Sequence, residues 1–167
     1  MSTLRADLAA NRHSRKGQVV VTALRVTQWA RGPGRPRWWS VPFTVAYRLV
    51  VDWVMGIEIP PTVQAGPGLA VFHGTGLVLH PDSRLGSNVL LRHGITLGTT
   101  GDDDQGVPPT VGDRVSIGAG AILLGPITVG DDAVIGAGAV VIRDVPAGAT
   151  VVGNPARVVR TAADRAV

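Results

Sequence analysis

Aliphatic residues recur every six positions along most of this chain, from residue 57 to residue 141. A surface helix predicts spacings of three and four, and a half-buried strand predicts strict alternation, so neither accounts for this period. A six-residue repeat is typical of a parallel β-helix, in which each rung points one aliphatic side chain into a narrow core. The positions that share the period are Ile57, Val63, Leu69, Leu79, Leu85, Leu91, Leu97, Val111, Ile117, Leu123, Val129, Ile135 and Val141.

The six-residue period breaks twice. Leu69 and Leu79 are ten residues apart, four more than one rung, and Leu97 and Val111 are fourteen apart, eight more than one rung. The segment 99–106, which includes Asp102, Asp103, Asp104 and Gln105, has no aliphatic residue to bury, so we expect it to leave the prism as a loop. Insertions on a regular solenoid are where sites are usually built.

Residues 1–55 follow a helical pattern instead of the six-residue period. One expected helix ends at Gly32-Pro33-Gly34, and a second follows Ser40 as the N-cap and ends at Gly56. The apolar residues expected on one face of the first helix are Val19, Ala23, Val26 and Ala30. The chain thus divides into a helical segment (1–55), a β-helix domain (56–152) and a C-terminal tail (153–167).

The second expected helix is apolar enough to raise the question of a membrane span. Arg48 and Asp52 lie within it, and each would be costly at the centre of a bilayer. Their i,i+4 spacing suits an ion pair on a helix surface. A packing helix is therefore preferred, ahead of an interfacial helix and then of a span. The four tryptophans, Trp29, Trp38, Trp39 and Trp53, all lie in this segment and suit core packing or a partner contact.

Composition narrows the chemistry that the chain can perform. It has no cysteine, which excludes disulfides, thiolate metal sites and a cysteine nucleophile. Nine of its 16 basic residues precede residue 56, yet the net charge is only +4 and no nucleic-acid-binding motif is present. A solvated basic face is preferred, placed near an anionic cofactor or associating weakly with a membrane surface. Residues 1–16 lack the pattern of a signal peptide, so we expect a cytoplasmic location.

Two histidines are the first candidates for catalysis. His73 lies in the first interruption, where Gly74 and Gly76 leave room for a ligand, and His93 follows in Arg92-His93-Gly94. Imidazole has an unperturbed pKa of about 6.5, so either residue could accept a proton from a hydroxyl near neutral pH. His80 and His13 lack such surroundings and are expected to have packing or surface roles. A structural role for His73 or His93 remains the alternative.

Residues 56–160 resemble the serine acetyltransferase family and its short exopolysaccharide relatives, which include the colanic acid acetyltransferases. The family has an acidic residue fifteen positions before its catalytic histidine, and Glu58, in Gly56-Ile57-Glu58-Ile59-Pro60, stands fifteen before His73. The resemblance implies a left-handed parallel β-helix and an acetyl-CoA-dependent O-acetyltransferase. It also implies that His73 is the general base and that Glu58 orients it.

The same resemblance implies where coenzyme A binds. The chain's Gly153-Asn154-Pro155-Ala156-Arg157 matches the family's closing motif. Arg143 and Arg157 are candidates for the phosphates or the adenine end, with plain surface charge as the alternative. The residues at family positions that contact the cofactor are Gly98, Thr99, Thr100, Ala119 and Ala137. No metal is expected.

The chain departs from the family where serine would bind. Serine acetyltransferases have an aspartate directly before the catalytic histidine, where this chain has Phe72, and an Asp-Pro pair that residues 11–15 lack. Losing both acidic residues should weaken binding of an ammonium group. Phe72, His93 and Arg92 suit a sugar acceptor instead, although Phe72 could be buried.

Three functions therefore remain, in a stated order. O-Acetyl transfer to a sugar or exopolysaccharide precursor comes first, transfer to serine or a related amino acid second, and a non-catalytic trimeric scaffold third. The family assembles as homotrimers or dimers of trimers, with sites between adjacent prisms, so the resemblance implies such an assembly here.

Overall fold

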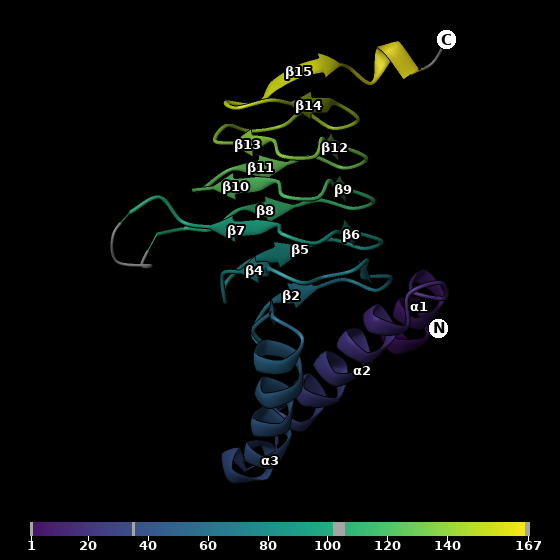
Figure 1. Ribbon diagram of the computed structural model, residues 1–167, viewed down its shortest axis with the longest axis vertical. Helices are drawn as coiled ribbons and strands as arrows, with labels where there is room; N and C mark the ends of the chain where they lie inside the picture. Colours follow the sequence, from purple (N-terminus) through teal and green to yellow (C-terminus); the bar gives the residue numbers. More distant parts are fainter. Residues whose placement is uncertain (1, 35, 102–105, 166–167) are drawn as a thin grey trace.

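Short parallel strands stack above a group of helices in the computed structural model (Figure 1). The structure describes residues 2–34, 36–101 and 106–165. The helices come first along the chain, and the π-helix η1 continues α3 without a break. Their bounds are α1 Thr3–Ala10, α2 Arg15–Ala30, α3 Arg37–Tyr47 and η1 Arg48–Val54.

Three sheets form the faces of the prism, and from β1 to β13 successive strands along the chain belong to successive sheets. The first sheet contains β1 Ile57–Glu58, β4 Leu77–Leu79, β7 Thr96–Gly98, β10 Ile122–Leu124 and β13 Val140–Val141. The second contains β2 Gln64–Ala65, β5 Arg84–Leu85, β8 Thr110–Val111 and β11 Thr128–Val129. The third contains β3 Ala70–Val71, β6 Leu90–Leu91, β9 Ser116–Ile117, β12 Val134–Ile135, β14 Thr150–Val152 and β15 Arg157–Arg160. The expected left-handed β-helix is confirmed.

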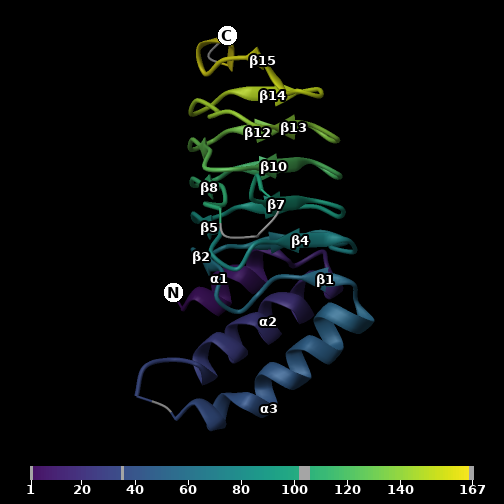
Figure 2. The same cartoon turned by 90° about the vertical axis from the view of Figure 1, so that its left-hand side faces the viewer.

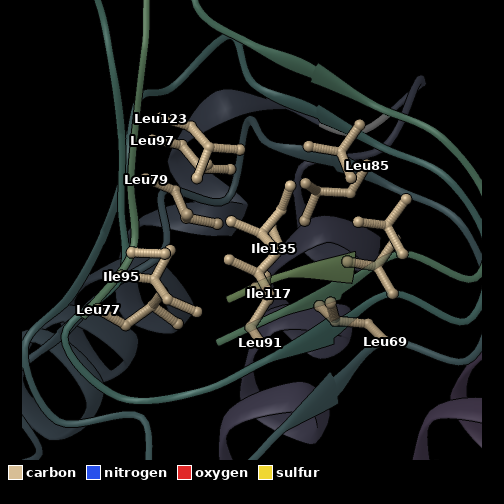
Figure 3. Packing of buried hydrophobic residues seen from close by; sticks show 14 of the residues in the cluster. Leu69, Leu77, Leu79, Leu85, Leu91, Ile95, Leu97, Ile117, Leu123 and Ile135 are labelled. Carbon is tan, nitrogen blue, oxygen red and sulfur yellow. The ribbon is translucent and has the colours of Figure 1, made fainter. Parts of the chain in front are cut away.

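All thirteen aliphatic residues of the six-residue repeat lie in the core and are at most 5% exposed. The parallel register places Leu79 beside Leu97 and Leu97 beside Leu123, so one side chain from each coil joins a continuous column. Figure 3 shows this column and a second that contains Ile117 and Ile135. The narrow prism is thus filled coil by coil, as the repeat predicts.

The first interruption is shorter than the sequence suggested. Val71, rather than Leu69, lies opposite Leu91 in the third sheet, so Leu69 belongs to a second column of buried side chains. Five residues separate Val71 from Leu77, whereas three separate Leu91 from Ile95, which lies opposite Leu77. The insertion is therefore two residues long, not four. The expectation failed because the repeat has two buried positions per rung, and the sequence does not reveal which one each aliphatic residue occupies.

The second interruption separates β7 from β8. The register resumes at Val111, which lies opposite Leu85. The expected loop includes Asp102, Asp103, Asp104 and Gln105, which lie outside the described residues.

The helices follow the expected order but differ in detail. In α2 the buried face includes Val20, Val21 and Leu24. Of the four residues expected on it, Ala30 is buried and Ala23 packs against the core, whereas Val19 and Val26 are exposed, so the expected face was half wrong. The helix packs on β3, and that contact selects the face one residue away. The second long helix begins at Arg37, and Ser40 is a buried residue inside it rather than its N-cap.

Polar side chains of the helices close the lower end of the prism, where the first coil has no further coil to pair with. Asp7 accepts hydrogen bonds from the backbone N–H groups of Gly68 and Leu69, at 2.7 and 3.0 Å. Asn11 accepts from the N–H of Val71 at 2.8 Å and donates to the carbonyl of Leu69 at 2.8 Å. These side chains take the part of a missing strand.

Arg25 and Tyr47 complete this polar cap. Arg25 forms a 2.7 Å ion pair with the fully buried Asp7 and donates to the carbonyls of Ala65 and Gly66. The Tyr47 hydroxyl donates to the carbonyl of Ile59 at 2.7 Å, and burial raises its pKa. At the other end, β15 pairs antiparallel with β14 and closes the stack (Figure 2).

No helix in the described part of the chain is long and apolar enough to cross a membrane.

Candidate functional site

The two-residue insertion after β3 presents His73 at a corner between the third and first sheets. His73 has φ 66° and Gly74 has φ 55°, so two consecutive residues adopt the left-handed conformation. That conformation is costly for a residue with a side chain and tends to persist at functional sites. The His73 carbonyl accepts a hydrogen bond from the N–H of Thr75 at 2.7 Å, and the imidazole is exposed.

His93 lies on the next coil beside His73. The two rings meet edge to face, with centroids 6.2 Å apart and an interplanar angle of 77°. The structure thus brings together the two histidines that the sequence singled out. Phe72 is half-buried and Arg92 is exposed at the same corner.

The corner continues upward as a column of stacked turns. The Gly94 N–H donates to the carbonyl of Thr75, the Gly120 N–H to that of His93, and the Gly138 N–H to that of Ala119. Ala119 and Ala137 therefore lie on successive coils above His93. A ligand that follows this edge would pass small side chains and reach the histidines.

Glu58 lies on β1 and lines a cavity beside η1. Within the described residues no hydrogen bond or ion pair joins Glu58 to His73, so the expected dyad stays a prediction. The cavity has a volume of about 440 Å³. Its lining residues are Arg48, Asp52, Trp53, Glu58, Pro60 and Pro61.

Asp52 is the residue lining this cavity whose pKa is shifted. Burial raises its pKa, the charge of Arg48 lowers it, and the charge of Glu58 raises it further, with a net increase. Its Oδ1 is buried without a hydrogen-bond partner. Arg48 acts on Asp52 through its charge, but no ion pair between them is present in the described part, so the expected pair on the helix surface is not formed.

Lys16 also reaches the corner of His73, although the sequence gave no reason to expect it. Its Nζ donates to the Thr75 hydroxyl at 3.0 Å, across 59 positions of sequence. No local pattern could have identified it, because α2 brings it to the site through the tertiary fold.

The other residues expected to bind coenzyme A lie at a different edge of the prism, where the strands of the first sheet end. Gly98 ends β7 and accepts a hydrogen bond from the N–H of Gly125 at 3.0 Å, and Thr99 and Thr100 follow it. Thr100 and Arg143 line one cavity of about 410 Å³. The remaining lining residues are Leu124, Gly125, Pro126, Ile127, Ile142 and Asp144.

These residues fit coenzyme A in chemical terms. Arg143 supplies a cation for phosphate, and the aliphatic side chains beside it suit the apolar parts of the cofactor. Arg157 begins β15 and is exposed at the upper end of the prism, where the Ala156 N–H donates to the carbonyl of Val140. One protomer thus has two separate groups of predicted site residues, one at the prism edge where the strands of the first sheet begin and one at the edge where they end.

No group of three or more metal-ligating side chains occurs among the described residues. His80, by contrast, is buried, and its Nδ1 accepts a hydrogen bond from the N–H of Asp82 at 3.2 Å. It therefore has the packing role expected from its context.

Comparison with known proteins identifies relatives of the whole chain. The model of the family described as bacterial transferase hexapeptide (six repeats) matches residues 108–143. A protein of Escherichia coli K12 named as the colanic acid biosynthesis acetyltransferase WcaB is 35% identical over 156 residues, which cover 91% of this chain and 96% of that protein. The serine acetyltransferase of Helicobacter pylori 26695 is 47% identical over 107 residues, or 64% of this chain and 63% of that enzyme.

Solved structures give the same result. The apoenzyme of soybean serine acetyltransferase aligns with a TM-score of 0.81 and 36% identity over 94% of this chain and 67% of that one. The serine acetyltransferase of Brucella abortus S19 in complex with coenzyme A aligns with a TM-score of 0.78 and 31% identity, over 94% of this chain and 66% of that one. The similarity includes the helices as well as the prism.

Proposed function

The chain belongs to the serine acetyltransferase-like hexapeptide acyltransferases, and we propose that it transfers the acetyl group of acetyl-CoA to a hydroxyl of a sugar or exopolysaccharide precursor. The observation that carries this proposal is the exposed His73, held in a left-handed insertion against His93. A relative that aligns with this chain over 96% of its own length is named as a colanic acid biosynthesis acetyltransferase, which favours a carbohydrate acceptor.

His73 acts as the general base in the proposed reaction. Its imidazole takes the proton of the acceptor hydroxyl while the acceptor oxygen bonds to the acetyl carbonyl carbon. The carbon–sulfur bond then breaks, and the proton passes from His73 to the departing thiolate. Because the chain has no cysteine to form an acyl-enzyme intermediate, direct transfer from acetyl-CoA to the acceptor is the simplest route. Glu58 is proposed to orient His73 and to stabilise the transient imidazolium.

The acceptor is proposed to extend from His73 toward the cavity beside Glu58. Asp52 and Arg48 line this cavity and can hydrogen-bond sugar hydroxyls, and the exposed ring of Trp53 can stack on the apolar face of a sugar. Phe72 stands where serine acetyltransferases have an aspartate, so the site lacks that charge for an ammonium group. Serine remains the second candidate because several relatives are named as serine acetyltransferases.

A homotrimer or a dimer of trimers is proposed as the active assembly. The two groups of predicted site residues lie on opposite edges of the first sheet, and neighbouring prisms could bring the His73 edge of one protomer to the Arg143 edge of the next. Sedimentation equilibrium of the purified chain measures the number of protomers, and a monomer at the concentrations used in the assay would refute this assembly.

The acceptor class can be tested by measuring the release of free coenzyme A from acetyl-CoA. The wild-type chain is assayed with a panel of sugars and nucleotide sugars and with serine, homoserine and threonine. We expect turnover with a carbohydrate acceptor and little with serine. Turnover with serine alone would exchange the two candidates, and no turnover with any acceptor would favour a scaffold.

A further inference from the structure

The helix α3 and its continuation η1 form the end of the molecule opposite the C-terminus. Figure 2 shows α3 on the side of α2 that faces away from the strands, and Figure 1 shows the two helices side by side beneath the stack. One side of α3 packs on α2, and η1 packs on β1. The outward side has no covering element in the described part of the chain.

The outward side of α3 and η1 carries a continuous apolar stripe. We call Trp38, Val41, Val45 and Leu49 the outer stripe, and these side chains are 71, 55, 51 and 56% exposed. Spacings of three, four and four place them on one helix face. The buried residues of the same helix, among them Tyr47 and Val51, lie on the opposite face. An exposed apolar strip of this length marks an interaction surface.

The exposed charges of the whole helical segment have a single sign, and Arg31 and Arg48 are the ones that flank α3 along the chain. Residues 1–56 contain only two acidic residues, and Asp7 is buried in its ion pair with Arg25 while Asp52 is half-buried. Exposed cationic side chains are distributed over the described helices. They are Arg5, Arg12, Arg15, Lys16, Arg31 and Arg48. This segment therefore presents apolar and positively charged groups to the outside.

Two occupants of the stripe can be weighed on these charges. A second copy would bring the same cationic helices against each other, and like charges repel. An anionic lipid surface would be attracted to them. Tryptophan is enriched at membrane interfaces, and Trp38 in the outer stripe and its neighbour Trp39 are 71 and 45% exposed. The charge and the aromatic residues together favour the lipid surface.

We infer that the outer stripe docks the protein peripherally on an anionic bilayer, with α3 lying in the plane of the interface. A helix that lies flat buries its apolar face at the boundary of headgroups and acyl chains while cationic side chains meet the lipid headgroups. This surface is separate from His73 and does not depend on the identity of the acceptor.

Vesicle binding tests the inference directly. The full-length chain is mixed with vesicles of phosphatidylcholine alone or of phosphatidylcholine with phosphatidylglycerol, and co-sedimentation and tryptophan emission are recorded. We expect binding to the anionic vesicles, a blue shift of the emission, and loss of binding as salt is added. Failure of the wild-type chain to bind anionic vesicles at low salt would overturn the inference.

Matched variants locate the surface. Val45→Asp and Leu49→Asp should abolish vesicle binding, whereas Val159→Asp, an exposed valine on β15 at the opposite end, should leave it unchanged. Circular dichroism confirms the fold of each variant. Equal vesicle binding by Val45→Asp, Leu49→Asp and wild type would overturn the inference. It would also be overturned if wild type bound no vesicles and Val45→Asp changed the oligomeric state, because the stripe would then contact a second copy. Acetyl transfer to a soluble acceptor should persist in Val45→Asp, so a failure of docking is distinguishable from a failure of the proposed activity.

Discussion

At the scale of single residues, Asp52 beside η1 is a buried carboxylate that lowers the stability of the folded protein while no ligand is bound. Its Oδ1 is buried without a partner, and burial raises its pKa despite the nearby charge of Arg48. An unsatisfied buried acceptor costs free energy in the folded protein. Asp52 lines the cavity, so rotation of its carboxylate toward a ligand hydroxyl would remove that cost, and this is the physical reason for proposing the acceptor here.

Asp52→Asn is therefore expected to raise the free energy of unfolding at neutral pH. The folded pKa lies above the ordinary value of 3.8, so the folded state binds the proton more tightly than the unfolded chain does. The wild type consequently loses stability as the pH rises from about 3.8 through the raised folded pKa, and the variant does not. Urea unfolding at a series of pH values measures the difference.

Asp164→Asn provides the control with the opposite sign. Hydrogen bonds from the N–H and hydroxyl of Thr161 lower the pKa of Asp164, so its removal should destabilise the chain at neutral pH. Equal stability of Asp52→Asn and wild type at neutral pH would contradict the account of Asp52.

Glu58→Gln tests whether Glu58 positions the general base. Glu58 is exposed, so the fold should be kept, while kcat should fall by roughly 10 to 10²-fold, less than on removal of His73 itself. The KM for acetyl-CoA should not change, and Glu58→Asp should recover part of the rate. Steady-state kinetics give these values, and a kcat equal to that of wild type would remove Glu58 from the mechanism.

At the scale of elements, the helices act as an end cap for the prism. The cap depends on polar side chains that satisfy the backbone of the first coil, with Asp7, Asn11 and Arg25 at its centre. Asp7→Ala would leave Arg25 and the N–H groups of Gly68 and Leu69 without their acceptor. We expect a loss of about 3–5 kcal/mol in the free energy of unfolding, measured by urea denaturation.

The chain offers an ion pair of the same length as a control for Asp7. Arg114 and Asp132 are also joined at 2.7 Å, but both side chains are about half exposed. Solvent screens such a pair, so Asp132→Asn, which removes the charge and suits the left-handed backbone at this position, should change stability little. Losses of similar size in Asp132→Asn and Asp7→Ala would show that burial is not what makes the Asp7 pair important.

Elements differ in how far the sequence predicts them. The prism was predictable because each rung repeats the same burial requirement, and all thirteen repeat positions are in the core. The length of the first insertion was not, because Leu69 and Val71 both fit a buried position and only the register distinguishes them. The start of α3 was missed because Ser40 resembles an N-cap, although in the fold it is buried within the helix.

Site residues with a local sequence signature were predictable, and those brought together only by the tertiary fold were not. His73 and His93 were found as neighbours because each lies at a glycine-rich corner that the sequence marks. Lys16 and Asp52 were not found as site residues, because distant segments of the tertiary fold bring them there. Contacts that span about sixty positions, such as that of Lys16 with Thr75, have no local signature.

At the scale of the whole molecule, the two groups of site residues suggest a shared active site. If His73 of one protomer works with Arg143 of its neighbour, the variants His73→Ala and Arg143→Ala should complement each other. Mixed assemblies refolded from both variants should recover part of the wild-type rate at low acetyl-CoA, because some interfaces would combine two intact groups. Absence of recovery in verified mixed assemblies would place both groups in one protomer's site.

The central claim is that His73 is the base of an acetyltransferase. It is tested most directly by comparing His73→Ala with His13→Ala, a change at an exposed histidine hydrogen-bonded to Arg12 outside the site, in the assay of coenzyme A release with the best acceptor. The account predicts that His73→Ala lowers kcat by roughly 10² to 10⁴-fold with an unchanged fold, while His13→Ala retains the wild-type rate. Turnover by His73→Ala at the wild-type rate would contradict it.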